Sequence, residues 1–143
     1  MKVTLENLKT KDLKAYHSLL TEVLGEVVDW DIMVAKFKEN HPSFKVVVAK
    51  KDSEIIGTIS FSLIDSFTQT SDPRIEFSNF AVTSAARGTD AAKMLMNFVT
   101  DYARADGYKS VVVNCGINAE RAHAFYEKMG FKRADAARFV LVT

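Results

Sequence analysis

The chain has 143 residues, of which 48% are hydrophobic and 26% are charged, a composition that suits one domain with its own core and excludes disordered and fibrous classes. Nineteen Lys and Arg residues balance eighteen Asp and Glu residues, for a net charge of +1, which gives no electrostatic reason to expect nucleic acid or an anionic membrane as partner. The single cysteine, Cys115, excludes an intramolecular disulfide framework and a multi-cysteine metal site, and we expect it to be partly buried at a strand end. The N-terminus lacks a signal-like apolar stretch and no apolar run reaches membrane-spanning length, so we expect a soluble cytoplasmic protein without a metal.

The first half of the chain predicts one strand, two helices and three further strands. Val3 and Leu5 alternate with polar neighbours, as in a short half-buried strand. Thr10 is a potential cap for a helix closed by Gly25, and Asp29 is a potential cap for a second helix that ends before Pro42. The three strands are expected over residues 44–50, 55–63 and 74–82.

The second half predicts helices over 88–105 and 118–129, and strands over 108–114 and 139–142. Asn118 is a good residue to begin its helix. Gly130 suits the left-handed position after that helix, with Phe131 in hydrophobic contact behind it. Hairpins in the first half and a β-α-β crossover in the second predict one α/β domain over residues 1–143, with a mixed, mostly antiparallel sheet flanked by helices.

Two segments carry candidate chemistry. The strand that ends at Val82 enters a helix through a turn of small residues, where free N–H groups and the helix dipole favour an anion. Gly88, Ala91 and Ala92 would let a ligand approach the backbone, although most strand-to-helix turns bind nothing. On the later helix, Tyr126 lies on the apolar stripe, where a phenol would be half-buried and could reach a polar target.

Together these segments resemble the core motifs of the GNAT superfamily of N-acetyltransferases. The family pattern is a strand ending in Val, then Gln/Arg-x-x-Gly-x-Gly/Ala at a helix start, then a strand, an Asn and a helix ending Phe-Tyr-Glu-x-x-Gly-Phe. The matching residues are Val82, Arg87, Ala92, Asn118, Phe125, Tyr126, Glu127, Gly130 and Phe131. The resemblance covers residues 76–132, somewhat under half of the chain, and the preceding order of strands and helices also fits it.

The resemblance implies acetyl-CoA as cofactor. The backbone of Phe80, Ala81 and Val82 would splay from its neighbour and bind the pantetheine arm and acetyl carbonyl. Asn118 and Phe125 would contact the cofactor, and Tyr126 would stand near the thioester sulfur. The pyrophosphate would be held by the backbone amides of Arg87, Gly88, Thr89, Asp90, Ala91 and Ala92.

Asp90 departs from the family pattern, which has its central glycine there. A carboxylate about 5 Å from a bound phosphate would cost roughly 1–3 kcal/mol at effective dielectrics of about 80 to 20. This departure favours weakened cofactor binding if the side chain faces the phosphate, and costs little if it points to solvent.

The candidate catalytic residues are Tyr126 and Glu76. Tyr126 would protonate the leaving thiolate, and its alternative is a core position on the helix. Glu76 shares a strand face with Ser78, Phe80 and Val82 if side chains alternate regularly. It would act as base through water or attract the cationic amine, since the family often has its Glu where this chain has Ser78; the alternative is a solvated glutamate on an edge strand.

The acceptor is expected to be an amine. Trp30, Asp31 and Ser78 are candidate acceptor contacts, with a core position as the alternative for Trp30. The expected activity is transfer of acetyl from acetyl-CoA to a primary amine, with a small molecule preferred. The alternatives are a CoA-binding module that has lost catalysis, a protein N-terminal or lysine acetyltransferase, or an interaction domain without cofactor; a homodimer is left open.

Overall fold

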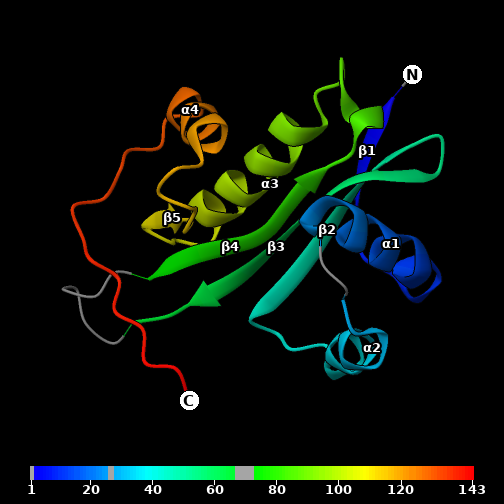
Figure 1. Cartoon of the computed structure of the whole chain (residues 1–143), viewed down its shortest axis with the longest axis horizontal. Helices are drawn as coiled ribbons and strands as arrows, with labels where there is room; N and C mark the ends of the chain where they lie inside the picture. The colour runs from blue at the N-terminus through cyan, green and yellow to red at the C-terminus, as the bar shows by residue number, and fades with distance from the viewer. Residues whose placement is uncertain (1, 26–27, 67–72) are drawn as a thin grey trace. The chain divides into compact units, whose positions relative to one another are not determined.

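The computed structural model describes residues 2–25, 28–66 and 73–143, and the chain divides into two compact units, 1–113 and 114–143. The first unit contains a five-stranded sheet in the order β1-β2-β3-β4-β5 (Figure 1). Its elements are β1 (Val3–Asn7), η1 (Thr10–Asp12), α1 (Leu13–Leu24), α2 (Trp30–Glu39), β2 (Phe44–Lys51), β3 (Glu54–Ile64), β4 (Arg74–Val82), η2 (Ser84–Ala86), α3 (Ala91–Ala105) and β5 (Ser110–Val112).

The sheet is mixed and mostly antiparallel, as predicted. β1, β2, β3 and β4 pair antiparallel in sequence order, and β4 pairs parallel with β5 after the α3 crossover. The β2–β3 hairpin turns at Asp52 and Ser53, whose φ angles of 54° and 65° match the left-handed conformation that tight hairpin turns require.

Each face of the sheet packs against different helices. On one face Val48 and Ala81 form a cluster with Tyr16, Leu19 and Leu20 of α1, against which Met33 of α2 also packs. The other face carries the strand residues that alternate with these, and α3 covers it; the fully buried side chains there are Val47, Ile59, Phe61, Ile75, Leu95, Met96 and Val99. The apolar sides of α1 and α3 therefore form two helical layers of the core, one on each face of the sheet.

The helix ends show where local prediction holds and where it fails. Asp29 caps α2 as expected, since its Oδ1 accepts a 2.9 Å hydrogen bond from the N–H of Ile32, and Gly25 closes α1 with φ 68°. Thr10 does not cap a helix: it begins the short turn η1, and α1 starts only at Leu13. α3 begins at Ala91 instead of residue 88 because Gly88 has φ 75° and cannot continue a right-handed helix.

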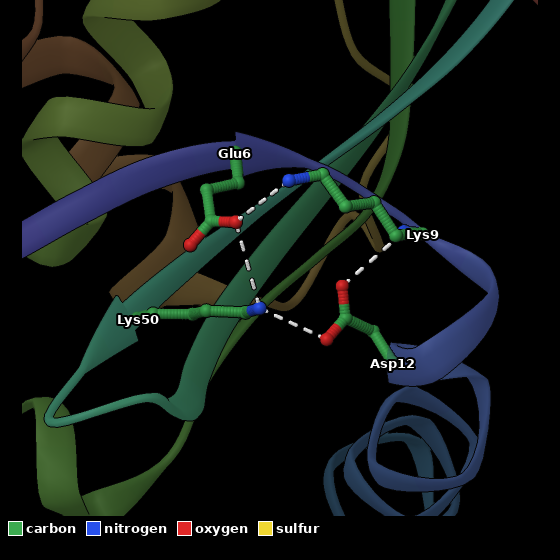
Figure 2. Close-up of polar contacts among 4 residues, drawn as sticks. All are labelled: Glu6, Lys9, Asp12 and Lys50. Carbon is green, nitrogen blue, oxygen red and sulfur yellow. Dashed lines mark hydrogen bonds and ion pairs between the residues drawn. The ribbon is translucent and has the colours of Figure 1, made fainter.

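A buried ion pair explains the turn before α1 (Figure 2). Lys50 Nζ lies 2.9 Å from Asp12 Oδ1 and 3.6 Å from Glu6 Oε1, and the Lys9 N–H donates to Asp12 Oδ2 at 3.2 Å. Burial acts to raise the pKa of Asp12, but the hydrogen bonds from Lys50 and Lys9 and the Lys50 charge hold it below its usual value. The hydrogen bond to Asp12 raises the pKa of Lys50 against the opposing effect of burial. The network ties the start of α1 to β1 and β2.

The second unit contains the helix α4 (Glu120–Lys128) and its flanking segments. The end of α4 is as predicted: Gly130 has φ 97° and donates to the carbonyl of Glu127 at 3.0 Å, while Phe131 donates to that of Tyr126 at 2.9 Å. These are the two bonds of a Schellman motif, and the rings of Tyr126 and Phe131, 5.6 Å apart, supply its hydrophobic contact.

Three expectations for the chain after β4 are wrong. β5 spans only Ser110–Val112, shorter than the predicted 108–114. Asn118 does not cap α4 through its side chain, because Ala119 occupies the cap position. Residues 139–142 form no strand: their side chains are 69–93% exposed and they pair with no strand of the described residues, so a short apolar run alone did not provide the partner that a strand needs. None of the described helices is long and apolar enough to cross a bilayer.

Candidate functional site

β4 contains a bulge that the sequence reading missed. Thr58 of β3 pairs with Ala81 while Ser60 pairs with Ser78, so β4 has one extra residue between these pairs. Asn79 sits in the bulge with φ 48°, a conformation that asparagine tolerates better than most residues. An asparagine inside an otherwise regular strand was the only signal for it.

The bulge changes which side chains share a face. Because paired residues point to the same side of a sheet, Ser78 and Ala81 lie with Ser60 and Thr58 on the α1 face. Val82, opposite Gly57, points to the other face. The predicted alignment of Glu76, Ser78, Phe80 and Val82 along one face is therefore wrong at Val82. The Phe80 ring packs edge-on against Phe77, at a centroid distance of 6.1 Å.

β4 also loses its parallel neighbour half-way along. Its pairing with β5 covers Arg74–Glu76 and ends at the Glu76–Val112 pair, and within the described ranges no other strand joins that edge. The Thr83 N–H donates to the Ile56 carbonyl of β3 at 2.9 Å. Because successive residues of an antiparallel ladder point to opposite edges, the N–H and C=O of Val82 point away from β3. The last part of β4 thus presents backbone polar groups along the edge that β5 leaves.

The turn after β4 satisfies some of its donors internally. The N–H groups of Arg87 and Thr89 donate to the carbonyls of Ser84 and Ala86, at 3.1 and 3.0 Å. The Ala91 N–H donates to Thr89 Oγ1 at 3.3 Å. These three amides are therefore already used within the turn.

Four other amides of this turn have no acceptor among the described residues: Gly88, Asp90, Ala92 and Lys93. The first intrahelical bond of α3 is Met94 N–H to Asp90 C=O at 2.8 Å, so these donors precede it. No atom lies within 4 Å of the position where a Cβ on Gly88 would sit. The turn consequently offers unused donors at the positive end of a fifteen-residue helix.

Asp90 occupies the cap position of α3 but does not act as a cap. Its side chain is exposed and accepts no hydrogen bond from the helix N-terminus. The Asp90 carboxylate therefore adds a negative charge to the turn that contains the four unused amide donors.

Glu76 is neither on an edge strand nor alone. It pairs with Ser62 of β3 and Val112 of β5, which corrects the edge-strand alternative. Its Oε1 lies 3.0 Å from Arg74 Nε, and both side chains are about two-fifths exposed, at 38% and 39%. The carboxylate is therefore accessible on the α1 face, held by a guanidinium.

Tyr126, in the second unit, is half-buried as predicted. Its ring contacts those of Phe125 and Phe131, at 5.7 and 5.6 Å. Burial, and secondarily the nearby Cys115, raises the pKa of the Tyr126 phenol. Cys115 itself is exposed, not partly buried as expected. The phenol therefore keeps its proton at neutral pH.

His123 of α4 and Asn118 in the loop before it make hydrogen bonds within the second unit. His123 Nε2 lies 2.8 Å from the Gly116 carbonyl and its Nδ1 lies 3.1 Å from an Arg133 nitrogen, so it links the loop before α4 to the segment after it. The exposed Asn118 uses its carbonyl to accept from the Glu120 N–H at 2.9 Å.

Trp30 is not a core residue, contrary to the alternative considered for it. It is 42% exposed at the start of α2, and its ring meets that of His17 edge-on at 5.3 Å. His17 Nε2 lies 2.7 Å from the Val28 carbonyl, so α1 contacts the residues that directly precede α2. Asp31 is exposed beside Trp30.

The structure therefore groups the predicted residues into two sets. Residues 76–92 form one continuous strand, turn and helix start in the first unit, and Asn118, Phe125 and Tyr126 lie along α4 in the second.

Comparison with known proteins identifies the family. The model of the acetyltransferase (GNAT) family matches residues 9–131. Human N-acetyltransferase 8 is 29% identical over 92 residues, which are 64% of this chain and 40% of that relative. The match thus spans well under half of the relative's length.

Solved structures share the fold at low sequence identity. A transcriptional regulator from Bacillus halodurans C-125 superposes with a TM-score of 0.86 at 21% identity, covering 99% of this chain and 100% of that one. The aminoglycoside-type acetyltransferase AAC(6')-Iy, solved with a CoA-containing bisubstrate analogue, gives a TM-score of 0.85 at 16% identity, covering 100% and 99%. With a family model matched over most of its length, and with the sheet, bulge and turn described above, the chain belongs to the acetyltransferase (GNAT) family.

Proposed function

We propose that this chain transfers the acetyl group of acetyl-CoA directly to a primary amine of a small molecule. One observation carries the proposal: β4 leaves β5 after Glu76 and runs into a turn with four unused backbone donors. A strand edge followed by a cluster of N–H groups suits an elongated ligand with an amide-containing arm and a diphosphate.

The residues of the first unit fit acetyl-CoA by their chemistry. The backbone of Phe80, Ala81 and Val82 would bind the pantetheine arm and acetyl carbonyl. The amides of Gly88, Asp90, Ala92 and Lys93 would hold the pyrophosphate. Compared with the set that the resemblance implies, this set adds Lys93 and leaves out three amides that donate within the turn, those of Arg87, Thr89 and Ala91. Arg87 would pair with a phosphate through its exposed guanidinium. In the second unit, Asn118 and Phe125 would contact the cofactor.

When bound, the cofactor would supply an activated acetyl thioester, and the chain would supply groups for the transfer. The N–H of Val82 would donate to the developing oxyanion. Tyr126 would give its proton to the departing thiolate, since the phenol is protonated at neutral pH. Glu76 would accept the amine proton through water, or would attract the ammonium, from its place beside Arg74.

The proposed acceptor class rests on two proteins that share this fold. A glucosamine-6-phosphate N-acetyltransferase from Arabidopsis thaliana, 17% identical, is among the proteins that share this fold. Together with the aminoglycoside-type enzyme it motivates amino sugars as first acceptors. Trp30, Asp31 and Ser78 are the proposed acceptor contacts. The second candidate function is a CoA-binding module without transfer, motivated by the uncommitted charge of Asp90 and by Ser78 in place of the family's Glu.

The test combines binding with turnover. Calorimetry with acetyl-CoA measures the Kd, and release of free thiol is followed with kanamycin, glucosamine 6-phosphate, spermidine and an alanine-initiated peptide. Binding with acceptor-dependent thiol release supports the proposal. Binding without release for any amine supports the CoA-binding module, and no binding at millimolar acetyl-CoA refutes both.

A further inference from the structure

Three hydroxyl groups are buried together under α1. Tyr16 of α1 is 4% exposed, and Thr58 and Ser60 of β3 are completely buried. Register places them on one face, since Thr58 pairs with Val48 and Ala81, the strand residues against which Tyr16 packs. Hydroxyl groups in such a position need partners, because burying one without a hydrogen bond is unfavourable.

One of the three is left without a partner. Thr58 Oγ1 donates to the Val47 carbonyl at 2.9 Å, whereas Ser60 Oγ makes no hydrogen bond to any of the residues that the structure describes. Burial raises the pKa of the Tyr16 phenol, and the adjacent hydroxyls of Ser60 and Thr58 offset part of that increase. The Tyr16 hydroxyl therefore lies next to Ser60, which still has a proton to donate.

The nearest functional neighbour of Ser60 is on β4. Ser60 and Ser78 are directly opposite in the ladder, where Cβ atoms are about 4.5–5.5 Å apart and side chains point the same way. Rotation of Ser60 about one bond brings its Oγ toward that of Ser78. Ser78 is exposed and directly precedes the bulge residue Asn79. A line of hydroxyls thus runs from beneath α1 to the surface of the proposed site.

We propose that Tyr16 and Ser60 are positioning residues for Ser78, whose oxygen they orient toward the amino group of the acceptor. The inference rests on the proposed function. On rotation of the Ser60 side chain, Tyr16 would donate to Ser60 and Ser60 would donate to Ser78, so that Ser78 turns a lone pair outward. An acceptor amine has N–H groups to donate, and holding one at Ser78 directs the nitrogen lone pair elsewhere for attack.

The chain offers a matched control for this idea. Thr21 Oγ1, also on α1, is the other buried hydroxyl without a hydrogen-bond partner among the described residues. Thr21→Val removes a buried hydroxyl that has no partner, and it should leave the melting temperature unchanged or raise it. Ser60→Ala removes the hydroxyl that the proposal places between Tyr16 and Ser78, so its melting temperature is measured together with its kcat/KM. Any effect on transfer that is confined to Ser60→Ala therefore reports position and not stability.

The experiment is a double-mutant cycle on acetyl transfer, with whichever amine of the panel wild type acetylates fastest. We expect Ser60→Ala to lower kcat/KM for the amine by about 3- to 10-fold, the loss of one hydrogen bond, with an unchanged Kd for acetyl-CoA. Tyr16→Phe should act in the same direction. In a Ser78→Ala background, Ser60→Ala should cause no further loss.

Three results would overturn the inference. They are a wild-type kcat/KM in Ser60→Ala, a loss that adds fully to that of Ser78→Ala, and an equal loss in Thr21→Val. If wild type binds acetyl-CoA but acetylates none of the four amines, the transfer function and this inference fail together. An active wild type with an unchanged Ser60→Ala variant refutes only the inference.

Discussion

Asp90 offers the sharpest quantitative test of the proposed phosphate-binding turn. Its carboxylate is exposed, does not cap α3 and lies among four amides that have no acceptor among the described residues. At about 5 Å in a medium near ε ≈ 80, each pair of like charges costs about 0.8 kcal/mol. A pyrophosphate with two charges is therefore penalised by about 1–2 kcal/mol. We expect Asp90→Asn, which removes the charge and keeps the shape, to tighten acetyl-CoA binding about 5- to 30-fold.

Calorimetric titration with acetyl-CoA measures this gain directly, and its salt dependence identifies the cause. The gain should shrink as salt rises, because exposed charges are screened over about 8 Å at physiological ionic strength. Asp101→Asn is the matched control, since Asp101 is an exposed aspartate on the same helix, paired with Arg104 at 3.3 Å. Eleven residues of helix separate it from Asp90 by about 16 Å. Equal Kd values for wild type and both variants would show that the Asp90 carboxylate does not face the phosphates.

Three further variants test other parts of the structure. Tyr126→Phe should slow transfer by about 100-fold or more without changing the Kd for acetyl-CoA, and wild-type kcat should fall only above pH 10, where the raised phenol pKa is reached; an unchanged kcat for the variant argues against an acid role. Lys50→Met should destabilise the fold by about 2–3 kcal/mol in denaturant titration, because Asp12 is left buried without its cation. Since the folded pKa of Asp12 is lowered, that pair should stabilise wild type fully above pH 3.8 and less as pH falls through the folded value, whereas the variant should lack this dependence. Gly130→Ala should cost about 1 kcal/mol or more through its φ of 97° alone, since no atom lies near the new Cβ; an unchanged melting temperature would contradict this.

The features that could be predicted from the sequence are those with short-range causes. The Schellman end of α4 follows from Gly130 and Phe131, and the cap of α2 follows from Asp29. The antiparallel pairing of β2 with β3 follows from hairpin spacing, and the β-α-β connection of β4 to β5 follows from the helix between them. Each depends on residues within a few positions of one another, where steric and hydrogen-bonding rules act directly.

The failures have long-range causes. η1 forms before α1 because Asp12 pairs with Lys50, thirty-eight residues away, and no local pattern contains that partner. The apolar run of residues 139–142 could not show whether another strand pairs with them. The exposure of Trp30 depends on His17 and on how α2 packs, not on the amphipathic pattern of α2.

The bulge in β4 shows how one local irregularity can determine a site. Without it, Glu76, Ser78, Phe80 and Val82 would share one face. The extra residue at Asn79 keeps Glu76 and Ser78 on the α1 face with Ser60 and turns the Val82 side chain to the other. In the proposed site, β4 would supply both the side chains that face the acceptor and the backbone edge that binds the cofactor. Deleting Asn79 should restore regular alternation and abolish transfer even if the sheet still forms, whereas substitution by glycine, which accepts the same φ, should preserve it.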